Sequence, residues 1–272
     1  MNRLFLPLFL LAAIFLGIAA GTAVAGSPPL PAAPAQMDHY VYLPLVHKSP
    51  DACEAIPGVI YNYLGVAEGY EPGKPPPENN PDYNLLLLGY DWVDEHKGLV
   101  RYDGGFDPYA PQFYTMFTDG RSPAFVNTYL AHGWDWDNHR PLPPPSSGPV
   151  TVLGVGVQPK EVILTPDSGY DIQYGNDAMV LYATEQQITL TYTRNDHIQV
   201  GYTIYIAGIC VEPSLRALYN QLNAAGRHNL PVLRGRQPLG RAWGGEVTIA
   251  IRDGAVFMDP RSCKDFWQGR CP

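Results

Sequence analysis

Residues 187–193 (QITLTYT) and 201–207 (GYTIYIA) decide the fold class of this chain. Both runs are rich in β-branched and aromatic residues, the types that favour a pleated, half-buried strand. Between them stands Arg194-Asn-Asp196, a turn signal. A strand, a turn and a second strand within about twenty residues predict an antiparallel pair.

Similar runs lie on both sides of this pair. Further strands are expected at residues 151–157, 179–183 and 246–252. Asp253-Gly254 signals a tight turn, and residues 256–258 (VFM) should return beside the strand before it. One helix interrupts the strands, with Pro213 in its first turn, Gly226 as its stop, and an apolar face formed by Leu215, Leu218, Tyr219 and Leu222. We predict a mainly β protein with an antiparallel core and one short helix.

The composition agrees with a folded, turn-rich protein. The chain has 272 residues, of which 46% are hydrophobic and 16% charged, with 27 Gly and 28 Pro. This composition excludes a disordered polyampholyte, a coiled coil and a collagen-like rod. Few charged residues and many turn formers favour short strands over long surface helices.

The N-terminal segment has the features of a secretion signal. Arg3 precedes an apolar stretch, and Ala23-Val24-Ala25 is a small-x-small cleavage site. The alternative, a transmembrane anchor, requires about 20 apolar residues, and this run is shorter and contains Pro7 and Gly17. We therefore expect cleavage after residue 25, a secreted, extracytoplasmic protein, and no membrane span in the mature chain.

Proline-rich stretches divide the remainder. Residues 26–50 should form a Pro/Ala tether with a short strand, and residues 51–149 an acidic, aromatic, loop-rich region packed on the core. Within that region, residues 85–92 and 124–136 are expected to form buried strands or a short helix. The stretch 141–149 (PLPPPSSGP) is the predicted boundary before the β domain of residues 150–272.

Charge is distributed unevenly between the two halves. Residues 26–150 contain six Lys/Arg and fifteen Asp/Glu, whereas residues 151–272 contain eleven of each. Binding to phosphates requires clustered cations, so nucleic acid is excluded as a partner. We expect a monomer with an acidic, soluble surface.

The four cysteines suggest disulfides, because their number is even and the protein is expected to be exported. Cys263 and Cys271 would close a short loop at the C-terminus, and Cys53 would then pair with Cys210; free thiols are the alternative. In the loop between the last two cysteines, Phe266 and Trp267 are too apolar for a disposable extension, and we expect them to fold back onto the core.

A series of segments resembles the lysostaphin-type (LytM-type) zinc endopeptidases, which cut peptide cross-links of bacterial cell walls. The segments, in order, are residues 169–172 (GYDI), 178–183 (AMVLYA), 218–222 (LYNQL), 233–240 (LRGRQPLG) and 246–252 (EVTIAIR) with Asp259-Pro260. The resemblance covers roughly residues 165–260 and rests on order and spacing. It implies an antiparallel β sandwich of the hybrid-motif, lysostaphin-like type.

The residues at the family's functional positions differ from those of the family. The zinc-binding positions fall on Asp167, Asp171 and Thr248, of which only Asp171 matches, and the catalytic positions fall on Glu246 and Gln221. A catalytic zinc usually has three good protein ligands, including His. The resemblance therefore implies a catalytically silent protein without a cofactor, which binds cell-wall peptide or glycan at the bacterial envelope.

Two other hypotheses remain open. In the first, Asp167, Asp171 and Glu246 form a rebuilt hydrolase site for zinc or another divalent cation, with His132 or His139 contributing. In the second, the protein binds glycans, and the loop of residues 132–139 (HGWDWDNH) supplies a platform of Trp134, Trp136, His132 and His139. A rigid aromatic loop packed at a domain junction would explain the same residues more simply.

Overall fold

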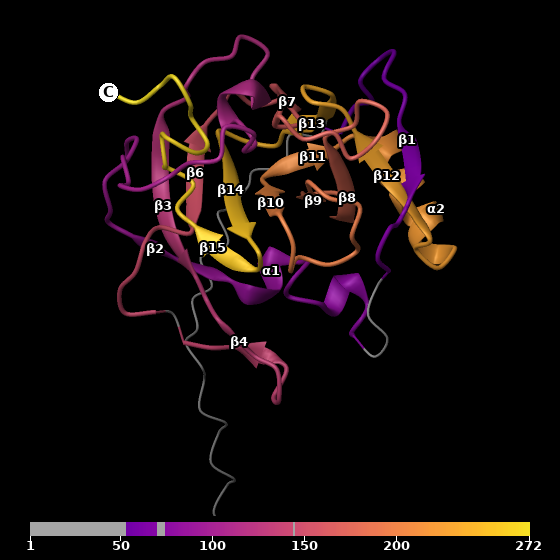
Figure 1. Cartoon of the computed structure of the whole chain (residues 1–272), viewed down its shortest axis with the longest axis horizontal. Coiled ribbons are helices and arrows are strands. Elements are labelled where there is room, and N and C mark those ends of the chain that lie inside the picture. The colour runs from indigo at the N-terminus through magenta and orange to yellow at the C-terminus, as the bar shows by residue number, and fades with distance from the viewer. Residues whose placement is uncertain (1–52, 70–73, 144) are drawn as a thin grey trace, which may run out of the picture. The chain divides into compact units, whose positions relative to one another are not determined.

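The computed structural model describes residues 53–69, 74–143 and 145–272, and one antiparallel sheet of ten strands dominates this part of the chain (Figure 1). In spatial order the sheet runs β1 (Asn62–Gly65), β12 (Asn229–Leu233), β8 (Ala178–Ala183), β9 (Gln187–Thr191), β10 (Tyr202–Ala207), β14 (Glu246–Asp253), β6 (Val152–Gly156), β3 (Phe125–Ala131) and β2 (Tyr90–Val93). The tenth strand, β15 (Val256–Met258), pairs with the C-terminal end of β14.

Smaller elements complete the fold. A second sheet contains β11 (Ile209–Val211), β13 (Pro238–Ala242) and β7 (Val162–Leu164), and a short hairpin is formed by β4 (Trp134–Asp135) and β5 (Arg140–Pro141). The helices are α1 (Leu85–Leu88) and α2 (Pro213–Ala224), with 3-10 turns η1 (Pro77–Asn79) and η2 (Phe113–Met116).

The alternation of side chains along β14 separates two cores. Val247, Ile249 and Ile251 lie in the larger hydrophobic core, and all three are fully buried. Ala250 points to the opposite face and belongs to a smaller cluster with Tyr129 and residues of α1. Because successive side chains of a strand point to opposite faces, the large sheet is covered on both sides at this strand.

The predicted fold class is confirmed. Strands hold 35% of the described residues and helices 11%, and the sheets are antiparallel. In the same part of the chain, α2 is the only helix longer than six residues. The strands expected at residues 151–157, 179–183, 187–193, 201–207 and 246–252 correspond to β6, β8, β9, β10 and β14, and the expected return strand corresponds to β15.

The helix α2 follows the predicted sequence signals. Pro213 occupies its first turn, and the side chain of Glu212 accepts hydrogen bonds from the backbone N–H groups of Ser214 and Leu215. Leu215 and Tyr219 are buried against the sheet, where α2 lies beside β12 (Figure 1). Gly226 follows the helix with φ +93°, a conformation that glycine adopts at low cost.

The large sheet also contains strands from the N-terminal half. β1, β2 and β3 come from residues 62–131, and β3 pairs directly with β6 of the C-terminal half. The proline-rich stretch 141–149 connects β5 to β6. Strands from both sides of the predicted boundary at residues 141–149 are thus hydrogen-bonded in one sheet.

Both expected disulfides are present, Cys53–Cys210 and Cys263–Cys271. Phe266 and Trp267 are fully buried in the larger core, and the indole N–H of Trp267 donates to the carbonyl of Pro260 at 2.8 Å. The C-terminal segment is therefore part of the folded core.

The predicted signal segment and tether lie outside the described residues. Within residues 53–69, 74–143 and 145–272, no helix has the length and apolar character required to cross a membrane.

Candidate functional site

Three tyrosines lie in a row beside one aspartate. We call this group the tyrosine surface; it consists of Asp107, Tyr109, Tyr170 and Tyr202. The ring centroids of Tyr109 and Tyr170 are 6.2 Å apart, and those of Tyr170 and Tyr202 are also 6.2 Å apart. Tyr109 is 57% exposed and Tyr170 38%, whereas Tyr202 is buried beneath them. Two rings therefore face solvent, and the third anchors them to the sheet.

A local turn places Asp107 and Tyr109. The sequence Asp107-Pro108-Tyr109-Ala110 has aspartate and proline at the first two positions that a type I turn favours. The N–H of Ala110 donates to the carbonyl of Asp107 at 3.2 Å, and the Asp107 carboxylate accepts the N–H of Tyr109 at 2.8 Å. The same carboxylate thus orders the turn that presents the first tyrosine.

The loop after β7 supplies Tyr170. Its hydroxyl donates to Asp107 Oδ2 at 2.5 Å, and its backbone N–H donates to the hydroxyl of Ser168 at 3.1 Å. Ser168 is in turn fixed by the buried carboxylate of Asp177, which accepts hydrogen bonds from both its N–H and its hydroxyl. Burial, followed by the charge of Asp167, raises the pKa of Asp177.

Gly169 allows the two loops to approach closely. Its N–H donates to the carbonyl of Tyr109 at 3.0 Å. A Cβ atom at position 169 would lie 2.0 Å from Cδ1 of Tyr109, so the ring occupies the space that a side chain would need. The glycine therefore determines where the ring of Tyr109 lies.

The C-terminal segment supports the tyrosine surface from below. Phe266 packs edge-on against Tyr202 with centroids 6.0 Å apart. The side-chain amide of Gln268 donates to the carbonyl of Asp107 at 2.8 Å. Because Cys263–Cys271 closes this segment into a loop, the surface rests on a covalently restrained base.

The electrostatics of the surface favour neutral tyrosine hydroxyls. Burial, and then the hydrogen bond and charge of Asp107, raise the pKa of Tyr170 to about 12. Burial and the same carboxylate also raise the pKa of Tyr202. The surface thus presents flat apolar faces beside hydroxyls and a carboxylate, a combination suited to the apolar face and hydroxyl groups of a sugar.

The two tryptophans of the predicted platform contact each other but differ in exposure. Trp134 and Trp136 lie edge to face on the β4–β5 hairpin with centroids 6.5 Å apart. Trp134 is half-buried and packs against the smaller core cluster, whereas Trp136 is 42% exposed. The ammonium group of Lys74 lies 5.3 Å from the ring centroid of Trp136. One face of the Trp136 ring is therefore in contact with a cation of the protein itself.

The two histidines of the same loop have separate surroundings. His132 Nε2 lies 3.3 Å from Asp91 Oδ2 and is shielded from solvent. His139 is exposed in the hairpin turn with φ +50°. Neither is part of a group of three or more His, Cys, Asp or Glu ligand atoms in the described residues.

The predicted metal ligands do not converge on one site. Asp167 lies over Gly235 in the loop after β7, and Asp171 accepts the N–H groups of Gln173 and Gly175 in an exposed turn. Thr248 is buried on the face of β14 that carries Ala250, opposite the larger core. Among the described residues, Asp167 and Asp171 thus have contacts in loops, whereas Thr248 lies within the sheet.

The predicted catalytic positions are also apart. Glu246 accepts hydrogen bonds from the hydroxyl of Tyr129 and the amide of Asn127, both at 2.9 Å, on β14. Gln221 is exposed on α2, which contacts β12 and β8. Two strands, β9 and β10, separate β8 from β14, so these two side chains do not form one site.

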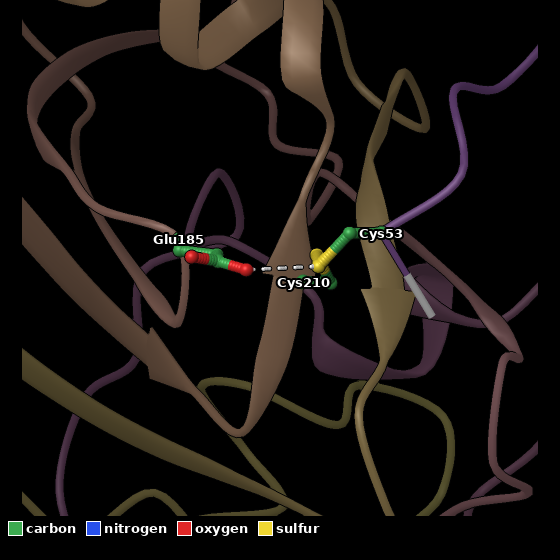
Figure 2. A group of neighbouring side chains, drawn as sticks. All are labelled: Cys53, Glu185 and Cys210. Atoms are coloured by element: carbon green, nitrogen blue, oxygen red, sulfur yellow. Dashed lines mark hydrogen bonds between the residues drawn. A yellow bond between two sulfur atoms is a disulfide. The ribbon is translucent and has the colours of Figure 1, made fainter. Parts of the chain in front are cut away.

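Three side chains in the described ranges do bring potential metal ligands within 4.8 Å of one another: Cys53, Glu185 and Cys210 (Figure 2). The two sulfurs, however, are bonded to each other. Cysteine binds zinc as a thiolate, and a disulfide sulfur has neither a proton to lose nor the charge of a thiolate. Glu185 Oε1 lies 3.4 Å from Cys53 Sγ as a packing contact, and the oxidised group is not a metal centre.

Sequence reasoning missed the tyrosine surface. Tyr109, Tyr170 and Tyr202 are spread over more than ninety residues and follow no period, so only the tertiary structure groups them. The only local pattern in this group is Asp107-Pro108, which indicates a turn but not the contacts among the tyrosines.

Comparison with protein-family models, with curated proteins and with solved structures found no match for this chain.

Proposed function

We propose that this protein is a secreted, non-catalytic monomer that binds a glycan of the bacterial cell envelope through the tyrosine surface. The observation that carries the proposal is the pair of exposed rings, Tyr109 and Tyr170, fixed by hydrogen bonds to Asp107. Exposed aromatic groups on loops of a rigid scaffold are typical of recognition surfaces. Their rigidity reduces the entropy lost when a ligand binds.

Two further observations support this proposal. Disulfides persist in oxidising compartments, and both pairs of cysteines are bonded in this fold. The carboxylates of Asp171 and Glu246 accept hydrogen bonds from different groups, and the carboxylate of Asp167 lies over Gly235, so the three do not surround a common point, which favours binding over hydrolysis.

Retention on insoluble polysaccharide tests the proposal. Purified protein is incubated with peptidoglycan sacculi, chitin and cellulose, and the bound fraction is measured together with the release of soluble sugar or peptide. We expect retention on at least one polymer without release. Tyr109→Ala or Tyr170→Ala should weaken retention roughly two- to twelvefold, the effect of losing one aromatic contact of about 0.5–1.5 kcal/mol.

Two matched variants distinguish the possible surfaces. Tyr63→Ala removes a tyrosine that is similarly exposed, at 55%, but lies on β1, and it should leave retention unchanged. Trp136→Ala tests the hairpin platform. Loss of retention in Trp136→Ala with full retention in Tyr109→Ala would place the site on the hairpin and refute the tyrosine surface. No retention on any polymer would refute glycan binding.

A further inference from the structure

A cleft of about 480 Å³ lies between α2 and the turn from β8 to β9. One wall is a single face of α2, formed by Arg216, Tyr219, Asn220 and Asn223, whose spacing of three, four and seven residues places them on the same side of a helix. The other wall is the end of β8 with the following turn, residues 182–185. Small-molecule sites typically have volumes of about 300–1,000 Å³.

Groups of opposite charge line this cleft together. Glu78 and Glu185 supply carboxylates, and Arg216 supplies a guanidinium group. The Arg216 and Glu185 side chains are 3.6 Å apart and more than one-third exposed. An ion pair of this kind contributes little to stability, so the guanidinium of Arg216 can turn toward a ligand at low cost.

A buried ion pair outside the cleft orients two residues of the α2 wall. Arg227 donates to both carboxylate oxygens of Asp196 at 2.8 and 2.7 Å. The same guanidinium donates to the hydroxyl of Tyr219 at 3.2 Å and to Oδ1 of Asn223 at 2.6 Å. Because Oδ1 of Asn223 accepts from Arg227, the amide NH2 group of Asn223 is the donor that this side chain has left to offer, whereas Tyr219 is buried and only supports the wall.

The two walls of the cleft therefore carry different chemical groups. Donors come from Arg216 and Asn223 on α2, and carboxylates come from Glu78 and Glu185 on the facing elements. We propose that the cleft binds a small zwitterion, an amino acid or a dipeptide, with its carboxylate on the α2 wall and its ammonium group between the two glutamates. The guanidinium of Arg216 suits a carboxylate through two parallel hydrogen bonds.

Calorimetric titration with three related peptides tests this inference. The probes are alanyl-alanine, N-acetyl-alanyl-alanine, which lacks the ammonium group, and alanyl-alanine amide, which lacks the carboxylate. We expect the zwitterion to bind and each blocked peptide to bind at least tenfold more weakly. Equal binding of all three peptides, or no heat of binding for alanyl-alanine up to about 10 mM, would overturn the proposal.

Variants locate the site. Arg216→Gln should weaken binding of alanyl-alanine at least tenfold, whereas Arg234→Gln, which removes an exposed arginine outside the cleft, should not. Equal melting temperatures of the two variants show that both are folded. If Arg216→Gln binds as the unmodified protein does, the cleft is not the site. The cleft shares no residue with the tyrosine surface, so Tyr109→Ala should leave dipeptide binding intact, and the two proposals can fail separately.

Discussion

The ring of Tyr109 lies over the α-carbon of Gly169, in the space where any other residue would place its Cβ atom. The N–H of the glycine donates to the carbonyl of the tyrosine, so the two loops are also bonded through their backbones. The glycine that suggested a peptidase motif in the sequence thus has a direct role in orienting an exposed aromatic ring.

Gly169→Ala should displace the ring of Tyr109 and lower stability. The added Cβ would stand 2.0 Å from Cδ1 and 2.9 Å from Cβ of Tyr109, and rotation of the ring does not move the Cβ atom, so the two loops must also shift. We expect about 1–3 kcal/mol of lost stability, a changed near-ultraviolet circular dichroism spectrum, and retention on glycan reduced as in Tyr109→Ala. Gly105→Ala is the control, because a Cβ added at that residue would have no atom within 4 Å. Equal spectra for both variants would contradict this role of Gly169.

The hydroxyl of Tyr170 should titrate late. Burial and Asp107 raise its pKa to about 12, so the neutral phenol is favoured in the folded state. Stability from this group is therefore complete below pH 10 and is lost as the pH rises toward 12. Ionised tyrosine absorbs at 295 nm, and the contribution of Tyr170 is the difference between the titration curves of the unmodified protein and Tyr170→Phe. This difference should have its midpoint near pH 12. In Asp107→Asn, the same component should shift toward pH 10; an unchanged midpoint would show that Asp107 does not act on this hydroxyl.

Glu246 should contribute to stability through its two donors. Glu246→Ala leaves the hydroxyl of Tyr129 and the amide of Asn127 without their acceptor, and we expect a loss of about 1–3 kcal/mol in urea unfolding. In Tyr129→Phe, the additional cost of Glu246→Ala should be smaller, because one of the two bonds is already absent. The exposed Glu95→Ala serves as the control and should change stability by less than about 0.5 kcal/mol. Strict additivity of the first two substitutions would contradict the bond between them.

The C-terminal loop should be required for full stability. Replacing Cys263 and Cys271 together by Ser removes a bridge over eight residues, which contributes about 2–3 kcal/mol. For a protein of this size the melting temperature should fall by roughly 5–10 °C. Truncation after Pro260 removes the fully buried Trp267 as well and should lower it further. A truncated protein that melts with the full chain would show that the tail is dispensable.

The sequence was most informative where hydrophobic and β-branched residues form unbroken runs. β9, β10 and β14 were predicted because such runs stand between clear turn signals. β12 was missed because Pro231 lies within it, and proline is rare in paired strands. In the structure, β8 pairs only with Val232 and Leu233, beyond the proline. The proline thus marks where the pairing with β8 stops, but the sequence did not show that β12 continues on both sides of Pro231.

The candidate site was less predictable than the fold. Asp171 fits a metal-binding pattern in the sequence, yet in the structure its carboxylate accepts two backbone N–H groups in a turn. Aspartate favours such turns without any ligand, so spacing alone does not separate the two roles. The contacts among Tyr109, Tyr170 and Tyr202 depend on how three distant segments meet, which no local pattern encodes.

The bond between Cys53 and Cys210 makes a closed ring of the chain between them, a stretch that includes every strand from β1 to β10. A protease that cuts one exposed loop in this stretch opens the ring without releasing a fragment, because both new ends remain covalently attached. The nicked protein keeps its mass, apart from one added water, until the disulfide is reduced. In an environment with proteases, a first cleavage in any of these loops thus breaks the backbone, but the two pieces stay joined by the disulfide.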